Sequence, residues 1–230
     1  MATYPREVLL GASASAPVDR KASASILAPV ERRIAGWALR LVPGWLESQH
    51  LTLMTLGWSA MVLAAALPAR SDPRWLAIVS IAIALQYLTD AVDGKVGQLR
   101  NAGLVRWGYY MDHLLDYVFL CAILITYGLL LPERFEYLMT LALAVAGGFM
   151  VSAFLARAVT GVLEISFLGL GPIEMRLVFI GINAWLATVG RAAMLRVVPY
   201  VIGAALIILA ALVFKTQRRL WDLDHRPRHD

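Results

Sequence analysis

Long apolar runs constrain this chain more than any other feature of its sequence. Six of them follow one another along the 230 residues, at Leu51–Pro68, Trp75–Val92, Trp107–Leu131, Tyr137–Ala156, Pro172–Gly190 and Val197–Phe214. Each run has about 18 residues or more, which is the length that an α-helix needs to cross roughly 30 Å of hydrocarbon. A charged fraction of only 16% is also far below that of a soluble domain. The sequence therefore predicts an all-α integral membrane protein with six transmembrane helices.

The N-terminal part divides into two segments with different patterns. Residues 1–24 are rich in Ser and Ala and predict a disordered cytoplasmic tail. In residues 25–46, apolar positions such as Val30, Ile34 and Trp37 recur at helical spacing, and most charged residues lie off that stripe. This pattern predicts an amphipathic helix in the membrane interface. The alternative is a linker helix that packs on the bundle formed by residues 47–216.

The distribution of positive charge predicts an orientation in the membrane. If the N-terminus is cytoplasmic, 16 of the 21 Lys and Arg residues lie on the cytoplasmic side. The positive-inside rule favours this arrangement, with both termini and the tail at 217–230 in the cytoplasm. The excess of positive charge is thus explained by membrane topology, and we expect no nucleic-acid partner.

Four aspartates stand out within and beside the second and third apolar runs. Asp90 and Asp93 are three residues apart, and Asp112 and Asp116 are four apart, so each pair shares one face of a helix. If the chain turns near Ala102, the two pairs reach nearly equal depth in an antiparallel hairpin. Four carboxylates can therefore converge at the cytoplasmic end of the two helices.

A carboxylate cluster near a membrane needs compensating positive charge, because each buried or crowded charge costs several kcal/mol. Oxygen ligands without Cys or His favour Mg²⁺ or Mn²⁺, and two such ions commonly clamp phosphoryl groups. Gly94, Gly97 and Gly108 lie on the same helix ends and leave room for a phosphate or nucleotide. The alternative is carboxylates paired with local arginines, or a polar cap on the hairpin.

These residues form a motif that resembles the signature of the CDP-alcohol phosphotransferases, D-x2-D-G-x2-A-R-x8/9-G-x3-D-x3-D. In this chain Asp90 is followed by Asp93 and Gly94, and after Gly97-Gln98 and nine further residues come Gly108, Asp112 and Asp116. The six apolar runs and the amphipathic N-terminal segment also match the family. The resemblance covers most of the chain beyond residue 25.

The resemblance implies a reaction and a role for each motif residue. Asp90, Asp93 and Asp112 would hold two Mg²⁺ or Mn²⁺ ions, and Asp116 would act as general base and also touch a metal. Gly94 and Gly108 would leave room for cytidine and its diphosphate. An alcohol hydroxyl would attack the β-phosphorus of a CDP-alcohol and displace CMP, which would make the protein a phospholipid-synthesis enzyme.

The motif departs from the family at two places. Gly97-Gln98 stands where members carry Ala-Arg, so Gln98 would contact the nucleotide without a charge, and Arg100 or Lys95 would compensate. The sequence SQHLT opens the first run where members have a Pro-Asn-x-x-Thr-like entry, and Thr52 is the residue that fits.

Three charged residues outside the motif are further candidates for substrate binding. Glu174 and Arg176 open the fifth run and would either cap a helix or line the acceptor pocket. Arg157 ends the fourth run and would bind a phosphate or reach toward headgroups. The predicted substrate-binding set is therefore Gly94, Gly97, Gln98, Arg100, Gly108, Arg157, Glu174 and Arg176.

The sequence leaves the substrates open. The favoured donor is CDP-diacylglycerol with a polar alcohol acceptor, and the alternative is CDP-choline or CDP-ethanolamine with a lipid acceptor. An Asp-rich membrane prenyltransferase and a cation transporter are the rival functions. The resemblance also implies a homodimer. From the distribution of positive charge we expect the protein to lie in the cytoplasmic membrane, surrounded by membrane lipids, with its active site facing the cytoplasm.

Overall fold

The structure is a computed structural model that describes residues 27–160 and 172–225. Within these ranges the chain forms seven α-helices and no strand. The helices are α2 (Ala28–Leu39), α3 (Ser48–Ala69), α4 (Leu76–Leu99), α5 (Val105–Leu130), α6 (Tyr137–Thr160), α7 (Pro172–Val189) and α8 (Arg191–Asp224). The predicted tail at residues 1–24 and the last residues of the C-terminal tail lie outside the described residues.

The helices confirm an all-helical membrane protein. Five of them, α3, α4, α5, α6 and α8, are long and apolar enough to cross a membrane. The helix predicted as the fifth span, α7, forms with 18 residues but does not belong to this group. The prediction of six spans is therefore confirmed for five.

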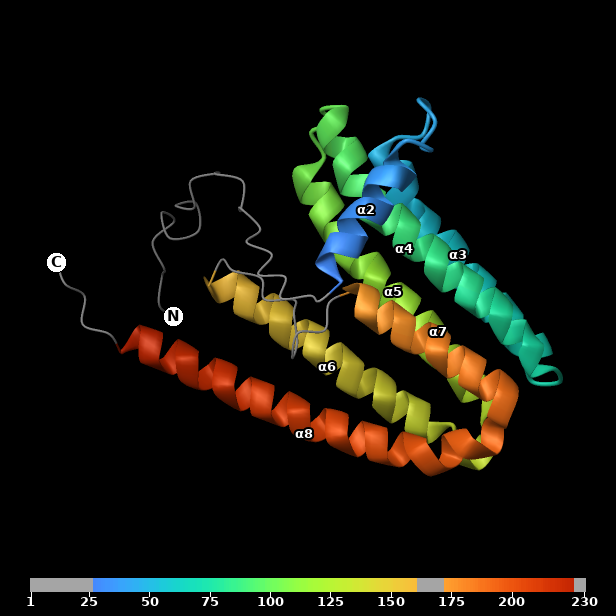
Figure 1. Cartoon of the computed structure of the whole chain (residues 1–230). Helices are drawn as coiled ribbons and strands as arrows, with labels where there is room; N and C mark the ends of the chain where they lie inside the picture. The colour runs from blue at the N-terminus through green and yellow to red at the C-terminus, as the bar shows by residue number, and fades with distance from the viewer. Residues whose placement is uncertain (1–26, 161–171, 226–230) are drawn as a thin grey trace, which may run out of the picture.

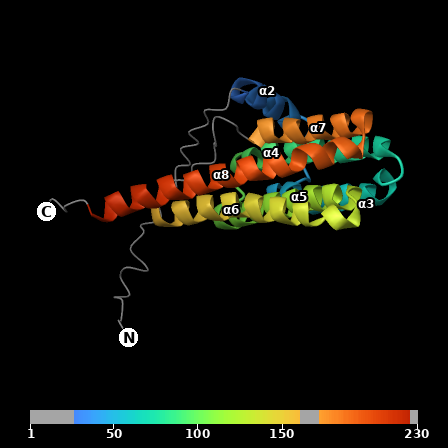
Figure 2. The same ribbon diagram turned by 90° about the horizontal axis from the view of Figure 1, so that it is seen from below.

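The helices pack so that α3 separates the two helices of the predicted hairpin. α3 makes extensive contacts with both α4 and α5, whereas α4 and α5 touch each other little. α7 packs on α4, α6 on α5, and α8 on α6, and α2 lies across α4 (Figure 1; Figure 2). The carboxylates of α4 and α5 therefore meet although their helices are not in close contact.

The core joins α3, α4, α5 and α7 through aliphatic and small side chains. Val62, Val79, Ile83, Ile123 and Leu186 are each no more than 2% exposed. A row of small residues on α3 lets its neighbours approach closely, which is how helices associate in lipid. That row is Ala65, Ala66 and Ala69.

A buried polar network fixes α7 against α4 and α5. The Tyr127 hydroxyl donates to Asn183 Oδ1 at 2.9 Å, and Asn183 Nδ2 donates to Ser80 Oγ at 3.0 Å. Asn183 is only 1% exposed, so these bonds satisfy its amide where water cannot. Arg176 lies two turns earlier on α7 and therefore shares the face that Asn183 turns toward α4.

Two helix boundaries differ from the predicted ones. α2 is shorter than the predicted 25–46 and ends at Leu39, since Pro43 and Gly44 follow and favour a turn. α8 continues ten residues beyond the predicted end at Phe214, so part of the predicted tail is helical. With 34 residues at about 1.5 Å each, α8 is longer than the hydrocarbon is thick.

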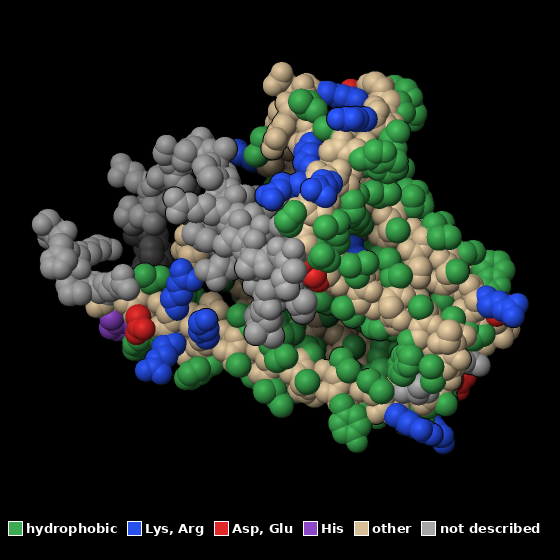
Figure 3. Space-filling model, viewed as in Figure 1, with side chains coloured by type: hydrophobic (Ala, Val, Ile, Leu, Met, Phe, Trp, Pro, Cys, Tyr) green, Lys and Arg blue, Asp and Glu red, His purple; other side chains and the backbone are tan. Residues whose placement is uncertain are grey.

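The surface is divided into an apolar flank and a basic end. Apolar side chains cover the flank of the bundle, whereas Lys and Arg side chains gather at the end where α2 lies (Figure 3). On α2 itself, Ala35 and Ala38 are buried against the bundle and Trp37 is 59% exposed. This arrangement fits a helix that packs on the protein with one face and meets its surroundings with the other.

Candidate metal centre and active site

Three of the four predicted carboxylates lie together. Asp90 of α4 and Asp112 and Asp116 of α5 each offer one carboxylate oxygen, and these oxygens lie within 4.8 Å of one another. All three residues are half-buried. The spacing of four residues places Asp112 and Asp116 on successive turns of one face of α5, as the sequence predicted.

The fourth carboxylate, Asp93, lies outside this group of three and is held by α3. Thr52 Oγ1 lies 2.8 Å from Asp93 Oδ2 and donates a hydrogen bond to it. Asp93 is 9% exposed, so this bond is shielded from water. Thr52 is the residue that fitted the family's entry to the first span, and the structure gives it a contact. The role of Asp93 as a metal ligand stays a prediction.

A guanidinium and an amide complete the cluster, and neither was predicted to do so. Arg176 Nη2 lies 2.8 Å from Asp90 Oδ2 and 3.5 Å from Asp116 Oδ1. Arg176 Nε donates to Gln86 Oε1 at 2.9 Å, and Gln86 Nε2 donates to Asp116 Oδ1 at 3.0 Å. Gln86 was missed by sequence reasoning. The sequence feature that could have revealed it is an amide within an apolar run. Gln86 comes four residues before Asp90 and therefore lies on the same face of α4.

The glycines of the motif lie in different surroundings. A Cβ atom added to Gly94 or Gly108 would meet no other atom within 4 Å, so both helices have open space there. A Cβ on Gly97 would lie 3.1 Å from Ser48 Oγ, because α3 approaches α4 closely at this point. Gln98 is exposed. The structure thus leaves space at Gly94 and Gly108, as a nucleotide would need.

Two of the predicted substrate-binding residues contact the segment before α3 instead. Arg100 Nη1 and Nη2 donate to the carbonyl oxygens of Leu46 and Pro43 at 2.6 and 3.0 Å. Glu174 Oε1 accepts a hydrogen bond from the backbone N–H of Leu27 at 3.2 Å. These bonds attach the N-terminal segment to α4 and α7. Substrate binding by Arg100 and Glu174 stays a prediction.

Arg157 is connected to the acidic cluster through a row of rings. Its guanidinium lies 4.1 Å from the centre of the Tyr109 ring. Tyr109 in turn packs on His113 at 4.2 Å, and His113 Nδ1 lies 3.8 Å from Asp112 Oδ2. Arg157, in the last turn of α6, therefore packs beside the residues of α5 that carry the cluster.

The donor set of the cluster fits hard divalent cations. Asp90, Asp112 and Asp116 offer only carboxylate oxygens, the ligands that Mg²⁺ and Mn²⁺ prefer. Because the three groups are half-buried and close together, their mutual repulsion is screened less than at an open surface. A bound cation would relieve that repulsion.

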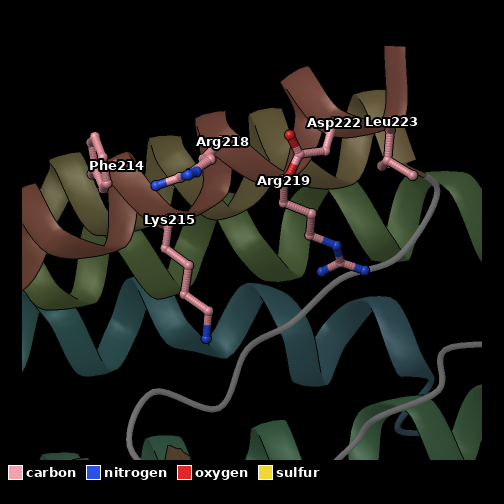
Figure 4. A pocket seen from close by; sticks show the side chains of 6 residues that line it. All are labelled: Phe214, Lys215, Arg218, Arg219, Asp222 and Leu223. Carbon is pink, nitrogen blue, oxygen red and sulfur yellow. The ribbon is translucent and has the colours of Figure 1, made fainter. Parts of the chain in front are cut away.

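The surface is hollowed beside α8. A pocket has a volume of about 580 Å³, and the described residues that line it all belong to α8: Phe214, Lys215, Arg218, Arg219, Asp222 and Leu223 (Figure 4). None of the clustered aspartates lines it. Its basic lining lacks the grouped carboxylates that a divalent cation needs.

Comparison with known proteins agrees with the chemistry of the cluster. The family model of the CDP-alcohol phosphatidyltransferases matches residues 45–216, a range that includes all four aspartates. Searches of curated proteins and of solved structures returned no match. The matched range covers well over half of the chain, and the chain therefore belongs to the CDP-alcohol phosphatidyltransferase family, which is a family of phosphotransferases.

Proposed function

We propose that the protein transfers a phosphatidyl group from CDP-diacylglycerol to a polar alcohol and releases CMP. The observation that carries this proposal is the convergence of Asp90, Asp112 and Asp116 within 4.8 Å on two membrane helices. Family membership supplies the reaction class. The lipid donor is supported by the apolar flank of the bundle, on which a diacyl substrate can approach the cluster from the membrane.

Asp116 carries the base function in this proposal. The acceptor hydroxyl gives its proton to a carboxylate oxygen of Asp116 while its own oxygen forms a bond to the β-phosphorus. The bond from that phosphorus to the bridging oxygen breaks, and CMP leaves with the electron pair. Gln86 Nε2 holds Asp116 Oδ1 at 3.0 Å, which limits the orientations of the carboxylate. A base that is fixed beside the hydroxyl contributes about 10²- to 10⁴-fold to the rate.

Asp90 and Asp112 would hold two Mg²⁺ or Mn²⁺ ions together with Asp93 and Asp116. When bound, these ions neutralise charge on the diphosphate and on the departing CMP. The open space beside Gly94 and Gly108 supports a nucleotide approaching both helix backbones there. Gln98 would offer it hydrogen bonds. The acceptor would lie toward Arg157, Arg176 and Glu174.

The same proposal includes a membrane arrangement. In this arrangement α7 crosses the membrane as a sixth span, and its packing against the spanning helix α4 supports this. The acidic cluster faces the cytoplasm, with both termini on that side and α2 in the interface. The protein acts as a homodimer in the cytoplasmic membrane.

The test is a reaction with purified protein, Mg²⁺ or Mn²⁺, a panel of CDP-alcohols and a panel of acceptors. We expect release of CMP that depends on the metal and is fastest with CDP-diacylglycerol. Release with CDP-choline and a lipid alcohol would reverse donor and acceptor. Turnover of prenyl diphosphates, or ion flux in vesicles without CMP release, would overturn the proposal.

Replacing the base gives a sharper test. In Asp116→Asn the side chain keeps its shape and can still accept the bond from Gln86, but it no longer takes a proton. We expect CMP release to fall by about 10²- to 10⁴-fold. Asp222→Asn, the same exchange on the exposed end of α8, should keep full activity. If Asp116→Asn retains a large share of its activity, another group is the base.

A further inference from the structure

The strongest unexplained feature of the site is the position of Arg176. Its side chain is only 13% exposed and reaches from α7 into the cluster. There Nη2 contacts Asp90 Oδ2 at 2.8 Å and Asp116 Oδ1 at 3.5 Å. One cationic group therefore touches two of the three carboxylates that would hold a divalent ion.

The guanidinium is held in this position by residues of α4. Gln86 is 1% exposed and uses both ends of its amide, because Oε1 accepts from Arg176 Nε and Nε2 donates to Asp116 Oδ1. The guanidinium of Arg176 also lies over the Tyr87 ring, with its carbon 5.5 Å from the ring centre. The register of α7 is set in turn by Asn183, two turns further along. These contacts restrict the Arg176 side chain more than that of an arginine exposed to solvent.

This placement has two opposite electrostatic consequences. Three carboxylates within 4.8 Å repel one another, and a fixed positive charge among them lowers that repulsion. A divalent cation that approaches the same oxygens meets the guanidinium at close range and is repelled by it. The charge of Arg176 therefore favours the cluster without metal and disfavours the binding of a divalent cation.

We propose that Arg176, held by Gln86, is a built-in counter-ion of the acidic cluster that stabilises the helix bundle without metal and lowers the affinity of the cluster for divalent cations. The proposal rests on the metal centre proposed above. It differs from the predicted role of Arg176 in the acceptor pocket, since it concerns the carboxylates and the cation rather than the substrate.

The experiment uses the full-length protein in detergent and measures Mn²⁺ binding by calorimetry and thermal unfolding with EDTA or saturating Mn²⁺. For Arg176→Gln we expect Mn²⁺ to bind about 10-fold more tightly, within the usual range of coupling between two sites. We also expect a lower unfolding temperature than wild type in EDTA, and a smaller difference in Mn²⁺. Unchanged or weaker Mn²⁺ binding would overturn the proposal.

A control and a second variant keep the test decisive. Arg134→Gln removes the same charge in the turn between α5 and α6, on the other end of the bundle, and should leave Mn²⁺ affinity unchanged. Gln86→Met keeps the volume of the side chain but releases Arg176, and we expect Mn²⁺ to bind a few-fold more tightly. If Arg176→Gln does not fold, Gln86→Met decides, and unchanged or weaker binding by that variant overturns the proposal.

The same measurement separates this proposal from the proposed function. Wild-type protein that binds no Mn²⁺ and shows no change in unfolding temperature would contradict the metal centre itself. Wild-type protein that binds Mn²⁺, together with an Arg176→Gln variant that binds it equally well, would contradict only the counter-ion.

Discussion

Thr52 connects the first long helix to the chemistry of the site through a single hydroxyl. Its Oγ1 lies 2.8 Å from Asp93 Oδ2 and 3.2 Å from the carbonyl oxygen of Ser48. A hydroxyl has one proton, and the shorter contact with a charged acceptor takes it. Because both Thr52 and Asp93 are buried, the bond fixes the orientation of the carboxylate on α4.

We expect Thr52→Val to reduce CMP release by about 10- to 100-fold, as loss of a hydrogen bond to a metal-ligating carboxylate commonly does. Valine keeps the shape of the side chain but leaves Asp93 without this donor. Thr52→Ser restores the hydroxyl and should recover most of the activity. The measurement is the rate of CMP release at saturating Mn²⁺ and again at limiting Mn²⁺. A valine variant as active as wild type at both concentrations would show that Asp93 does not need Thr52.

At this scale the sequence predicted the acidic cluster but not its cationic partner. Asp112 and Asp116 depend on spacing within one helix, which sequence shows directly. The contact of Arg176 with Asp90 spans 86 residues and depends on how α7 packs against α4. Arg176 was predicted to line the acceptor pocket because its position near the start of a helix was visible and its partner was not.

The sequence predicted the helices of the bundle, but it placed several of their ends wrongly. Hydropathy marks the part of a helix that lies in hydrocarbon, and it does not mark where hydrogen bonding stops. α4 continues seven residues past the predicted Val92, and α8 continues through Lys215 and Arg219 to Asp224. The order in which helices pack was also beyond the sequence, because nothing in the hairpin indicates that α3 separates α4 from α5.

α3 and α4 also approach each other closely at Gly97. Alanine in a helix interior is more stable than glycine by about 0.5–1 kcal/mol. A methyl group at Gly97 would lie 3.1 Å from Ser48 Oγ, which offsets that gain. We expect Gly97→Ala to raise the free energy of unfolding more when Ser48→Ala is also present. Ser48→Ala removes the hydroxyl that the new methyl group would otherwise crowd.

A double-mutant cycle measures this coupling as differences in the free energy of unfolding in detergent. Gly57→Ala on α3 is the matched control, since a Cβ there would meet no atom within 4 Å. It should give the same change in stability with and without Ser48→Ala. Equal effects of Gly97→Ala in both backgrounds would mean that α3 adapts to the methyl group without cost.

The whole molecule is asymmetric in how its helices are covered. In the most apolar stretch of α5, about half of the residues are buried by the rest of the chain. In the corresponding stretch of α8, only 6% are buried. The apolar side chains of α8, such as Tyr200 and Ile207, therefore face outward. In a membrane this face meets lipid or a second copy of the chain.

The proposed orientation of the bundle rests on where its positive charges lie, and it can be measured directly. The end formed by the turn between α4 and α5 carries Lys95, Arg100 and Arg106 close to the acidic cluster. The positive-inside rule predicts that this end lies in the cytoplasm and that the turn between α3 and α4 lies on the other side. In a Cys121→Ala background, which has no other cysteine, Leu104→Cys and Ser71→Cys mark the two ends at exposed positions. A membrane-impermeant maleimide should label Ser71→Cys in right-side-out vesicles and Leu104→Cys in inverted vesicles. The opposite pattern would put the acidic cluster on the outer face, away from cytoplasmic CDP-linked substrates, and the proposed reaction could not take place as described.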